Sequence, residues 1–156
     1  MREQIQAQDW IAGPVKVALI LDDDVTGSSA LQRALGSLGY EAHVMTDAGA
    51  TLEALRTSAE PMALFFDVEA RGATLDGQSY AFLIGVLLED LSLAQRHVFA
   101  VISSTADDVD LALGKTLNRL GAPVFDKPCA PRALEAFLTL ARGRLTPPAQ
   151  PEAATI

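Results

Sequence analysis

The sequence predicts a single α/β domain built on a doubly wound parallel sheet with helices on both faces. Short runs rich in Val, Ile, Leu and Phe alternate along the chain with segments whose apolar residues recur at helical spacing. That alternation is typical of βα units, and strands covered on both faces are almost continuously apolar. The length of 156 residues suits one core of this kind, without disulfides or a structural metal.

The first strand is the clearest, because residues 17–21 are all apolar and are followed at once by aspartates. The five predicted strands are 17–21, 42–45, 63–66, 98–102 and 123–125. Ligand sites in parallel α/β sheets lie at the carboxyl ends of the strands. The polar residues that follow these strands are therefore the candidates for a functional site.

Helical segments connect the strands. Apolar residues spaced three and four apart predict helices over 30–38, 80–88, 109–120 and 134–141, and a shorter one near 52–56. Gly121 ends the third of the longer helices, while Pro131 precedes the fourth and Gly143 follows its apolar positions. These elements complete five βα units.

The two ends of the chain fall outside this alternation. Residues 1–14 form an N-terminal extension that carries Ile5, Trp10 and Ile11, and these side chains could dock on the domain or on a partner. Residues 144–156 are rich in Pro and Ala and predict a disordered tail. The domain itself is expected over residues 15–143.

Composition excludes several classes of function. The 12 Lys and Arg residues against 20 Asp and Glu give a net charge of −8, so a basic face for nucleic acid is not expected. Cys129 is the only cysteine, which excludes an intrachain disulfide and favours the cytoplasm. The longest apolar stretch is far too short to cross a membrane. His43 and His97 lack a partner pattern and are expected to be core or surface imidazoles.

Polar side chains gather at the ends of four predicted strands. They are Asp22 and Asp23 after the first strand, Asp67 after the third, Ser103 after the fourth and Lys127 after the fifth. Carboxylates gathered in this way repel one another unless a cation is present, and Mg²⁺ prefers oxygen ligands. The hydroxyl and the ammonium can bind phosphoryl oxygens, so the set predicts phosphoryl chemistry.

Each of these residues also has a purely structural interpretation. Adjacent aspartates after a strand commonly cap a helix, and Asp24 fits that role. Ser103 and Ser104 could cap the next helix, and the end of the strand decides which hydroxyl is active. Lys127 could be a surface lysine. Capping alone does not explain why Asp67 and Lys127 accompany the acid pair.

The order and spacing of these motifs match a known pattern over about residues 15–143. The stretch LDDDVTGSSALQRALGSLGYEA contains an acid pair, a helix and a Leu-Gly-aromatic turn. Further matches are Asp67, Asp76-Gly77, Ser103, Gly121-Ala122 and Lys127-Pro128. Together they resemble a stand-alone response-regulator receiver domain of two-component signalling. This resemblance implies a flavodoxin-like (βα)5 fold with strand order 2-1-3-4-5.

The resemblance implies that Asp67 accepts a phosphoryl group from a histidine kinase or a histidine phosphotransfer protein, forming an acyl phosphate. Ser103 would take a phosphoryl oxygen and shift on activation, while Lys127 would pair with the phosphoryl group. Such a domain promotes only its own phosphorylation and dephosphorylation, so it is not an enzyme acting on other substrates. Its signal would pass through protein–protein contacts to an unknown target, and a homodimer through the fourth and fifth helices is a family expectation.

The same resemblance implies a Mg²⁺ site. Asp23 and Asp67 would bind the ion directly, together with the backbone carbonyl of Glu69, while Asp22 would act mainly through water. A cis peptide between Lys127 and Pro128 is also implied.

Two features depart from the family pattern. The loop after Asp67 is longer than usual, and Glu69 places a further carboxylate there, which predicts an altered phosphoryl lifetime unless this acid is exposed and inert. Val124 stands where an aromatic residue usually precedes the lysine by three. Phe125 is adjacent, but alternation along a strand should point it to the opposite face. Coupling of phosphorylation to the usual output face is therefore expected to be weak or differently built.

Two other functions stay open. Residues 22–26 also fit the Asp-x-Asp-x-Thr opening of haloacid-dehalogenase-like phosphatases, with Asp22 as nucleophile and Asp24 as general acid. That interpretation leaves Asp67 unused and lacks an acid pair after Lys127. The other alternative is a receiver-like interaction module that is never phosphorylated, which both departures support.

Overall fold

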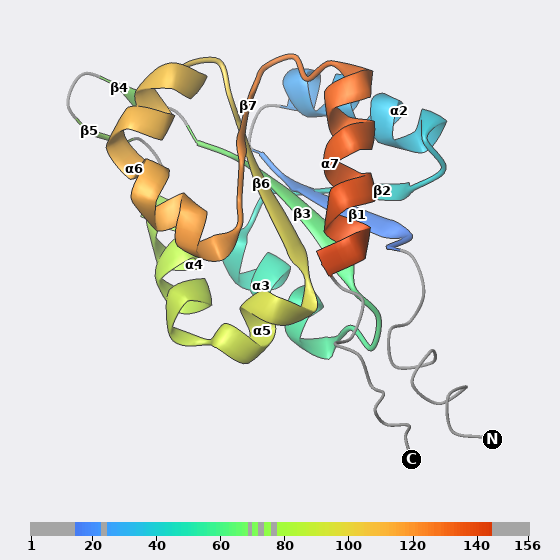
Figure 1. Ribbon diagram of the computed structural model, residues 1–156, viewed down its shortest axis with the longest axis horizontal. Coiled ribbons are helices and arrows are strands. Elements are labelled where there is room, and N and C mark those ends of the chain that lie inside the picture. The colour runs from blue at the N-terminus through green and yellow to red at the C-terminus, as the bar shows by residue number, and fades with distance from the viewer. Residues whose placement is uncertain (1–14, 23–24, 69, 72–73, 76–77, 145–156) are drawn as a thin grey trace.

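Five parallel strands form one sheet in the computed structural model, which describes residues 15–22, 25–68, 70–71, 74–75 and 78–144. The strands are β1 (Val17–Leu21), β2 (Glu41–Met45), β3 (Met62–Asp67), β6 (Val98–Ser103) and β7 (Val124–Asp126). They lie in the order β2-β1-β3-β6-β7, and every neighbouring pair is parallel (Figure 1). This arrangement confirms the predicted flavodoxin-like order, with β6 and β7 as its fourth and fifth strands.

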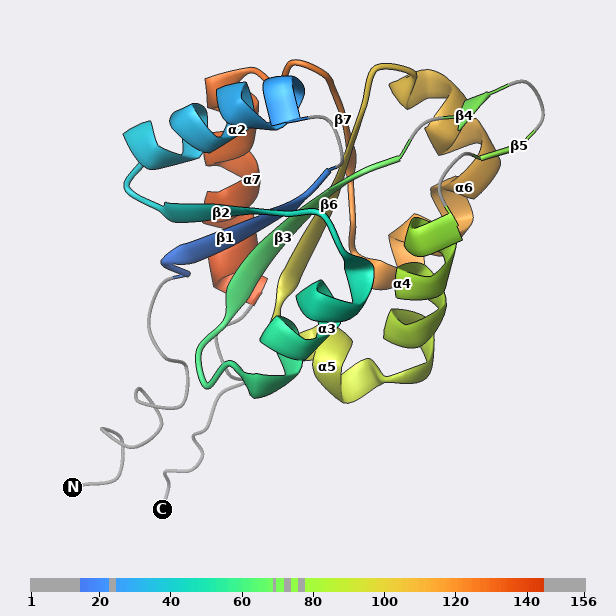
Figure 2. The same cartoon turned by 180° about the vertical axis from the view of Figure 1, so that it is seen from behind.

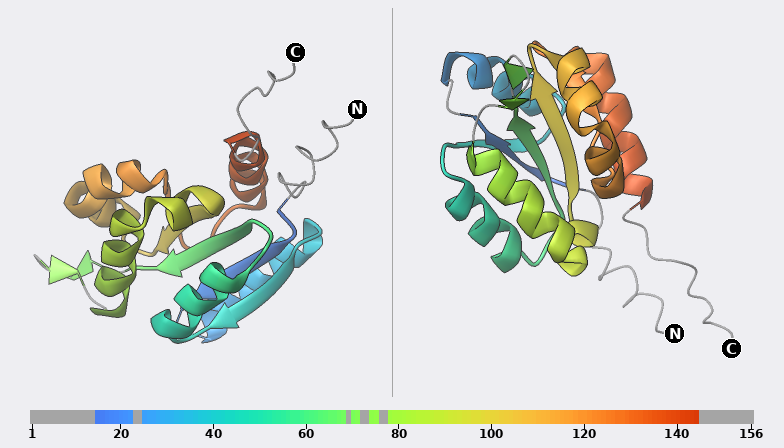
Figure 3. Two further views of the ribbon diagram at one scale, coloured as in Figure 1. Left: turned by 90° about the horizontal axis from the view of Figure 1, so that it is seen from below. Right: turned by 90° about the vertical axis from the view of Figure 1, so that its left-hand side faces the viewer.

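Helices cover both faces of the sheet. One face carries α2 (Val25–Ser37) and α7 (Pro131–Arg144). The other face carries α3 (Ala48–Thr57), α4 (Gln78–Glu89), α5 (Leu91–Arg96) and α6 (Ala106–Leu120). Figure 2 shows α3, α4 and α5 in front of the sheet, and the view from below in Figure 3 has α7 on one side of the strands and α3 and α4 on the other.

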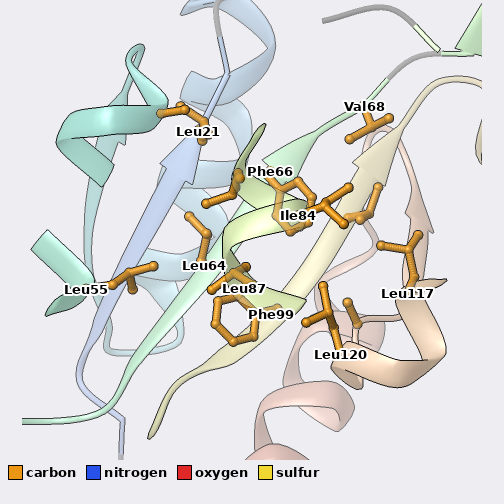
Figure 4. Packing of buried hydrophobic residues seen from close by; sticks show 14 of the residues in the cluster. Leu21, Leu55, Leu64, Phe66, Val68, Ile84, Leu87, Phe99, Leu117 and Leu120 are labelled. Carbon is orange, nitrogen blue, oxygen red and sulfur yellow. The ribbon is translucent and has the colours of Figure 1, made fainter. Parts of the chain in front are cut away.

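Alternation along the strands sorts the apolar side chains into two cores. On β1, Leu19 and Leu21 face α3 to α6, whereas Ala18 and Ile20 face α2 and α7. We name these the α3–α6 core and the α2–α7 core. Figure 4 shows part of the α3–α6 core, including Leu55, Leu64, Phe66, Leu87, Phe99 and Leu117. Burial on both faces explains why the strands are continuously apolar.

Local sequence sets the helix ends. Asp47 caps α3, because its carboxylate accepts a hydrogen bond from the backbone N–H of Ala50 at 2.8 Å. Helix α6 ends at Gly121, whose φ of 69° lies in the left-handed region that glycine adopts without steric cost. The predicted end of α6 is therefore confirmed, and α3 is longer than the predicted helix near residues 52–56.

Three features differ from the expectation. Helix α5 is separate from α4 and begins after Asp90, whose carboxylate accepts the backbone N–H of Leu93 at 3.0 Å. The loop after β3 contains an antiparallel hairpin of β4 (Ala70–Arg71) and β5 (Thr74–Leu75), and β4 lies beside α6 (Figures 1 and 2). Strand β7 begins one residue later than predicted, after Pro123, which has no N–H to donate.

Two predicted segments lie outside the described residues. They are the N-terminal extension, 1–14, and the tail, of which only residue 144 is described, as the end of α7. The predicted domain boundaries stay a prediction. None of the helices within the described ranges has the length and apolar content needed to cross a membrane.

Candidate functional site

The site lies at the carboxyl edge of the sheet, where β1, β3 and β7 end. Asp67 is the last residue of β3, Asp22 follows β1 directly, and Lys127 follows β7. Leu21 pairs in register with Phe66, so the next residues, Asp22 and Asp67, lie side by side at the edge. Three predicted site residues from distant parts of the chain are thereby brought together.

Lys127 is the positive centre of this group. Its Nζ donates a hydrogen bond to Asp67 Oδ2 at 2.8 Å and lies 3.4 Å from Asp22 Oδ2. Asp22 is completely buried and Asp67 is 6% exposed. Burial lowers the pKa of Lys127, but the hydrogen bond and charge of Asp67, with the charge of Asp22, outweigh it and raise the pKa above its ordinary value. Lys127 is therefore charged at neutral pH.

The charges of the three side chains do not balance. Asp22 and Asp67 carry two negative charges when ionised and Lys127 one positive charge, which leaves a formal charge of −1 on this group. Burying charge without full compensation costs free energy. Such an arrangement is more typical of a functional site than of a stabilising core.

Asp22 and Asp67 also fit a hard divalent cation. Mg²⁺ is commonly held by one or two carboxylates and keeps several of its waters. Within the described ranges, no group of three or more His, Cys, Asp and Glu side chains that could hold a metal ion is found. The other two predicted ligands, Asp23 and the carbonyl of Glu69, lie outside the described residues, as does the Asp76-Gly77 match.

Ser103 ends β6 next to this group and is completely buried, whereas Ser104 is exposed. The position of the strand end therefore favours Ser103 over Ser104 as the residue whose hydroxyl would bind a phosphoryl oxygen. Its Oγ accepts a hydrogen bond from the backbone N–H of Thr105 at 2.9 Å, and its carbonyl accepts one from the backbone N–H of Lys127 at 3.0 Å. Ser103 thus joins β6 both to the Lys127 segment and to the start of α6. The peptide between Lys127 and Pro128 is cis, as the resemblance implied.

Thr105 is a neighbour of the site that the sequence analysis missed. It is the residue before α6, and its Oγ1 lies 3.1 Å from Ser103 Oγ. A signal was present, because a threonine followed by Asp107 and Asp108 in the first helical turn is a typical helix start. Neither Ser103 nor Ser104 is the N-cap of α6, which is Thr105, but the Ser103 hydroxyl accepts the backbone N–H of that residue.

Val124 and Phe125 lie on opposite faces of β7, as alternation predicted. Val124 packs against the α3–α6 core, and Phe125 packs against the α2–α7 core. The ring of Phe125 lies edge-to-face with that of Phe137, with centroids 5.6 Å apart. Phe125 therefore does not replace the aromatic residue that is missing at position 124.

No family model matches the chain, and no curated protein matches its sequence. Solved structures do match. A CheY-like receiver domain from Methylobacillus flagellatus is 24% identical, with a TM-score of 0.60 over 81% of this chain and 98% of that one. Full-length FixJ from B. japonicum is 23% identical, with a TM-score of 0.63 over 90% of this chain and 64% of that one. A sensor protein from Polaromonas sp. JS666 is 22% identical, with a TM-score of 0.63 over 85% and 99%.

At these identities the likeness is one of fold, and fold alone does not establish function. The matches cover 81% to 90% of this chain. The chain therefore has the fold of the CheY-like response-regulator receiver domains.

Proposed function

We propose that the chain is a receiver domain that accepts a phosphoryl group on Asp67. The observation that carries the proposal is the contact of 2.8 Å between Lys127 Nζ and Asp67 Oδ2 at the carboxyl edge of the sheet. Asp67 supplies a nucleophilic carboxylate at a strand end, and Lys127 holds a positive charge beside it. The excess negative charge that Asp22 contributes favours binding of a cation at the same place.

In the proposed reaction, a carboxylate oxygen of Asp67 attacks the phosphorus of a phosphohistidine on a histidine kinase or phosphotransfer protein. A new O–P bond forms as the P–N bond breaks, and the imidazole leaves with the electron pair and takes up a proton. Lys127 stabilises the phosphoryl oxygens through its charge, and the fixed strand ends orient the carboxylate. Water later cleaves the acyl phosphate and regenerates Asp67.

Mg²⁺ belongs to the same proposal. Asp67 would hold it directly, with Asp23 and the Glu69 carbonyl as the further ligands that the resemblance implies, and Asp22 would act on it mainly through water. The bound ion supplies positive charge that offsets the charge of the phosphoryl oxygens. Asp22, which lies 3.4 Å from Lys127 Nζ, also helps to position the ammonium.

Ser103 would turn its hydroxyl toward a phosphoryl oxygen. It would then lose the hydrogen bond that it accepts from the Thr105 N–H. Because Thr105 directly precedes α6, this rearrangement would reach α6 first. Val124, which faces the α3–α6 core beside Val101, is aliphatic, so β7 offers no aromatic ring on that face to extend the movement of Ser103.

The test is the intact mass of the protein after incubation with acetyl phosphate or phosphoramidate and Mg²⁺. We expect one phosphoryl adduct that is absent in Asp67→Asn and in the presence of EDTA. Asp90→Asn is a matched control, because Asp90 caps α5 at the opposite, amino end of the sheet, and it should keep the adduct. An adduct that persists in Asp67→Asn would contradict the assignment.

One observation favours a second candidate, an interaction module that is never phosphorylated. The aliphatic Val124 and the opposite placement of Phe125 remove the usual aromatic connection to the output face. Mg²⁺ binding without any adduct would support this module. For the phosphatase alternative, turnover of a generic phosphatase substrate should be lost in Asp22→Asn and retained in Asp67→Asn.

A further inference from the structure

Three phenylalanine rings contact one another in series within the α2–α7 core. Phe137 of α7 lies in the middle, with its centroid 6.0 Å from that of Phe65 on β3 and 5.6 Å from that of Phe125 on β7. Both contacts are edge-to-face, with interplanar angles of 74° and 72°. Phe65 is completely buried and Phe137 is 7% exposed, so the rings have little room to move independently.

The two outer rings belong to the strands that lead to the ion pair, since Asp67 ends β3 and Lys127 follows β7. Side chains two residues apart along a strand share a face. Phe65 precedes Asp67 by two residues, and Phe125 precedes Lys127 by two residues. A single ring of α7 therefore contacts the residue two positions before each member of the Asp67–Lys127 pair.

The ring contacts among the described residues all lie in the α2–α7 core, whereas the opposite face of the sheet is packed without a ring pair. Ile102 faces the α2–α7 core, so Ser103, the next residue, points toward α6. Its described side-chain contacts there are with Thr105, and Val124 contributes only an aliphatic side chain. The series of described ring contacts therefore runs to α7.

We propose that the phosphoryl state of Asp67 is transmitted to α7 through the ring series Phe65–Phe137–Phe125. This inference rests on the proposed function. A phosphoryl group adds negative charge at Asp67 and draws Lys127 away from its position between Asp67 and Asp22. Movement of Lys127 displaces the end of β7, and Phe125 passes the displacement to Phe137.

The consequence is that the response reaches the surface on α7. Leu140 lies three residues after Phe137 on this helix and is 72% exposed, so it marks the part of the surface that changes with Asp67. Helix α6 responds less, because no aromatic ring is described that would move together with Ser103. The aromatic residue missing at position 124 is thus compensated by the aromatic ring series on the other face of the sheet.

The test is amide hydrogen exchange of the full chain with and without phosphorylation, followed by mass spectrometry of peptides from α6 and α7. Intact mass is measured on the same samples. We expect the amide exchange rates in α7 to change about fivefold or more, which corresponds to the lower end of ordinary coupling free energies. The exchange rates in α6 should change less. In Phe137→Leu, the phosphoryl group should still be gained while the change in α7 disappears.

Phe99→Leu is the matched control. Phe99 is a buried phenylalanine of the α3–α6 core, so this variant loses comparable packing but should keep the response of α7. Phe125→Leu is the second variant if Phe137→Leu does not fold, since Phe125 is less buried. It should abolish the response in the same way.

The two proposals fail in different ways. A protein that gains no phosphoryl mass contradicts the proposed function, and this inference falls with it. A protein that gains the mass but responds in α6 and not in α7 leaves the proposed function standing and overturns the ring series. A response of α7 that persists in both ring variants overturns it as well.

Discussion

The two ends of the sheet bury polar side chains in opposite ways. At the carboxyl end, Asp22, Asp67 and Lys127 place two negative charges and one positive charge close together. At the amino end, His97 is 3% exposed and its ring nitrogens hydrogen-bond to backbone groups. The three side chains of the first arrangement carry a net formal charge, and the second arrangement is neutral. The Asp22, Asp67 and Lys127 group is therefore typical of a functional site, whereas His97 is typical of a residue that stabilises the fold.

His97 joins three elements of the fold. Its Nδ1 accepts a hydrogen bond from the backbone N–H of Met62 at 2.9 Å, and its Nε2 donates one to the carbonyl of Leu55 at 2.8 Å. Burial lowers the pKa of His97 from 6.5 to about 4; the bond to Leu55 opposes this effect, and the charge of Arg96 adds to it. The neutral ring thus ties the start of β6 to β3 and to the last turn of α3.

Replacement of His97 should have the largest effect on stability. In His97→Leu, the Met62 N–H and the Leu55 carbonyl both lose a buried partner, which should lower the free energy of unfolding by about 4 kcal/mol. Urea unfolding followed by circular dichroism measures this loss. His43→Leu is the matched control, because His43 is half exposed, and it should change the value by less than about 0.5 kcal/mol. Similar losses in both variants would contradict the comparison.

His97 should also make the free energy of unfolding depend on pH. The pKa of His97 is about 4 in the folded protein and near 6.5 in the unfolded chain. Between these values the unfolded state binds the proton, so the contribution of His97 is complete above pH 6.5 and is lost as the pH falls toward 4. Its size is about 3 kcal/mol. Urea unfolding between about pH 4 and 7 should show this component in the wild type and not in His97→Leu.

At the carboxyl end, removal of a charge should stabilise the protein. Asp22→Asn leaves Asp67 and Lys127 as a balanced pair, so the free energy of unfolding in EDTA should rise by about 1 kcal/mol. Asp47→Asn should have almost no effect, since asparagine caps a helix as well as aspartate. Added Mg²⁺ should reduce the advantage of Asp22→Asn, because the cation would balance the wild-type charge. A loss of stability in EDTA would show that Asp22 is a stabilising residue.

The sequence was sufficient for the parts of the molecule in which one physical requirement acts alone. Burial on both faces makes the strands apolar, so their order of appearance and their bounds were predictable to within a residue or two. Parallel strands end at one edge, so Asp22, Asp67 and Lys127 could be grouped before their contacts were known. Alternation also placed Val124 and Phe125 on opposite faces.

The features that the sequence did not predict either depend on contacts between distant segments or are very short elements. His97 bonds to backbone groups 35 and 42 residues away, and no periodicity in the sequence indicates them. The β4–β5 hairpin lacks a strand-like apolar pattern because each of its strands has two residues. Helix α5 is only six residues long and is too short for a helical period to stand out. Its capping residue, Asp90, was the available signal.

The smallest effect should come from an exposed group beside His97. Arg96 donates a hydrogen bond from Nη2 to the carbonyl of Ser58 at 2.7 Å, just after α3. Water can replace this exposed bond, so Arg96→Ala should lower the free energy of unfolding by only about 0.5 kcal/mol. The same variant removes a nearby positive charge, so NMR titration should show a higher pKa for His97. If Arg96→Ala costs as much as His97→Leu, the end of α3 is held by the charged surface contact, and burial of a neutral histidine is not what stabilises the amino end of the sheet.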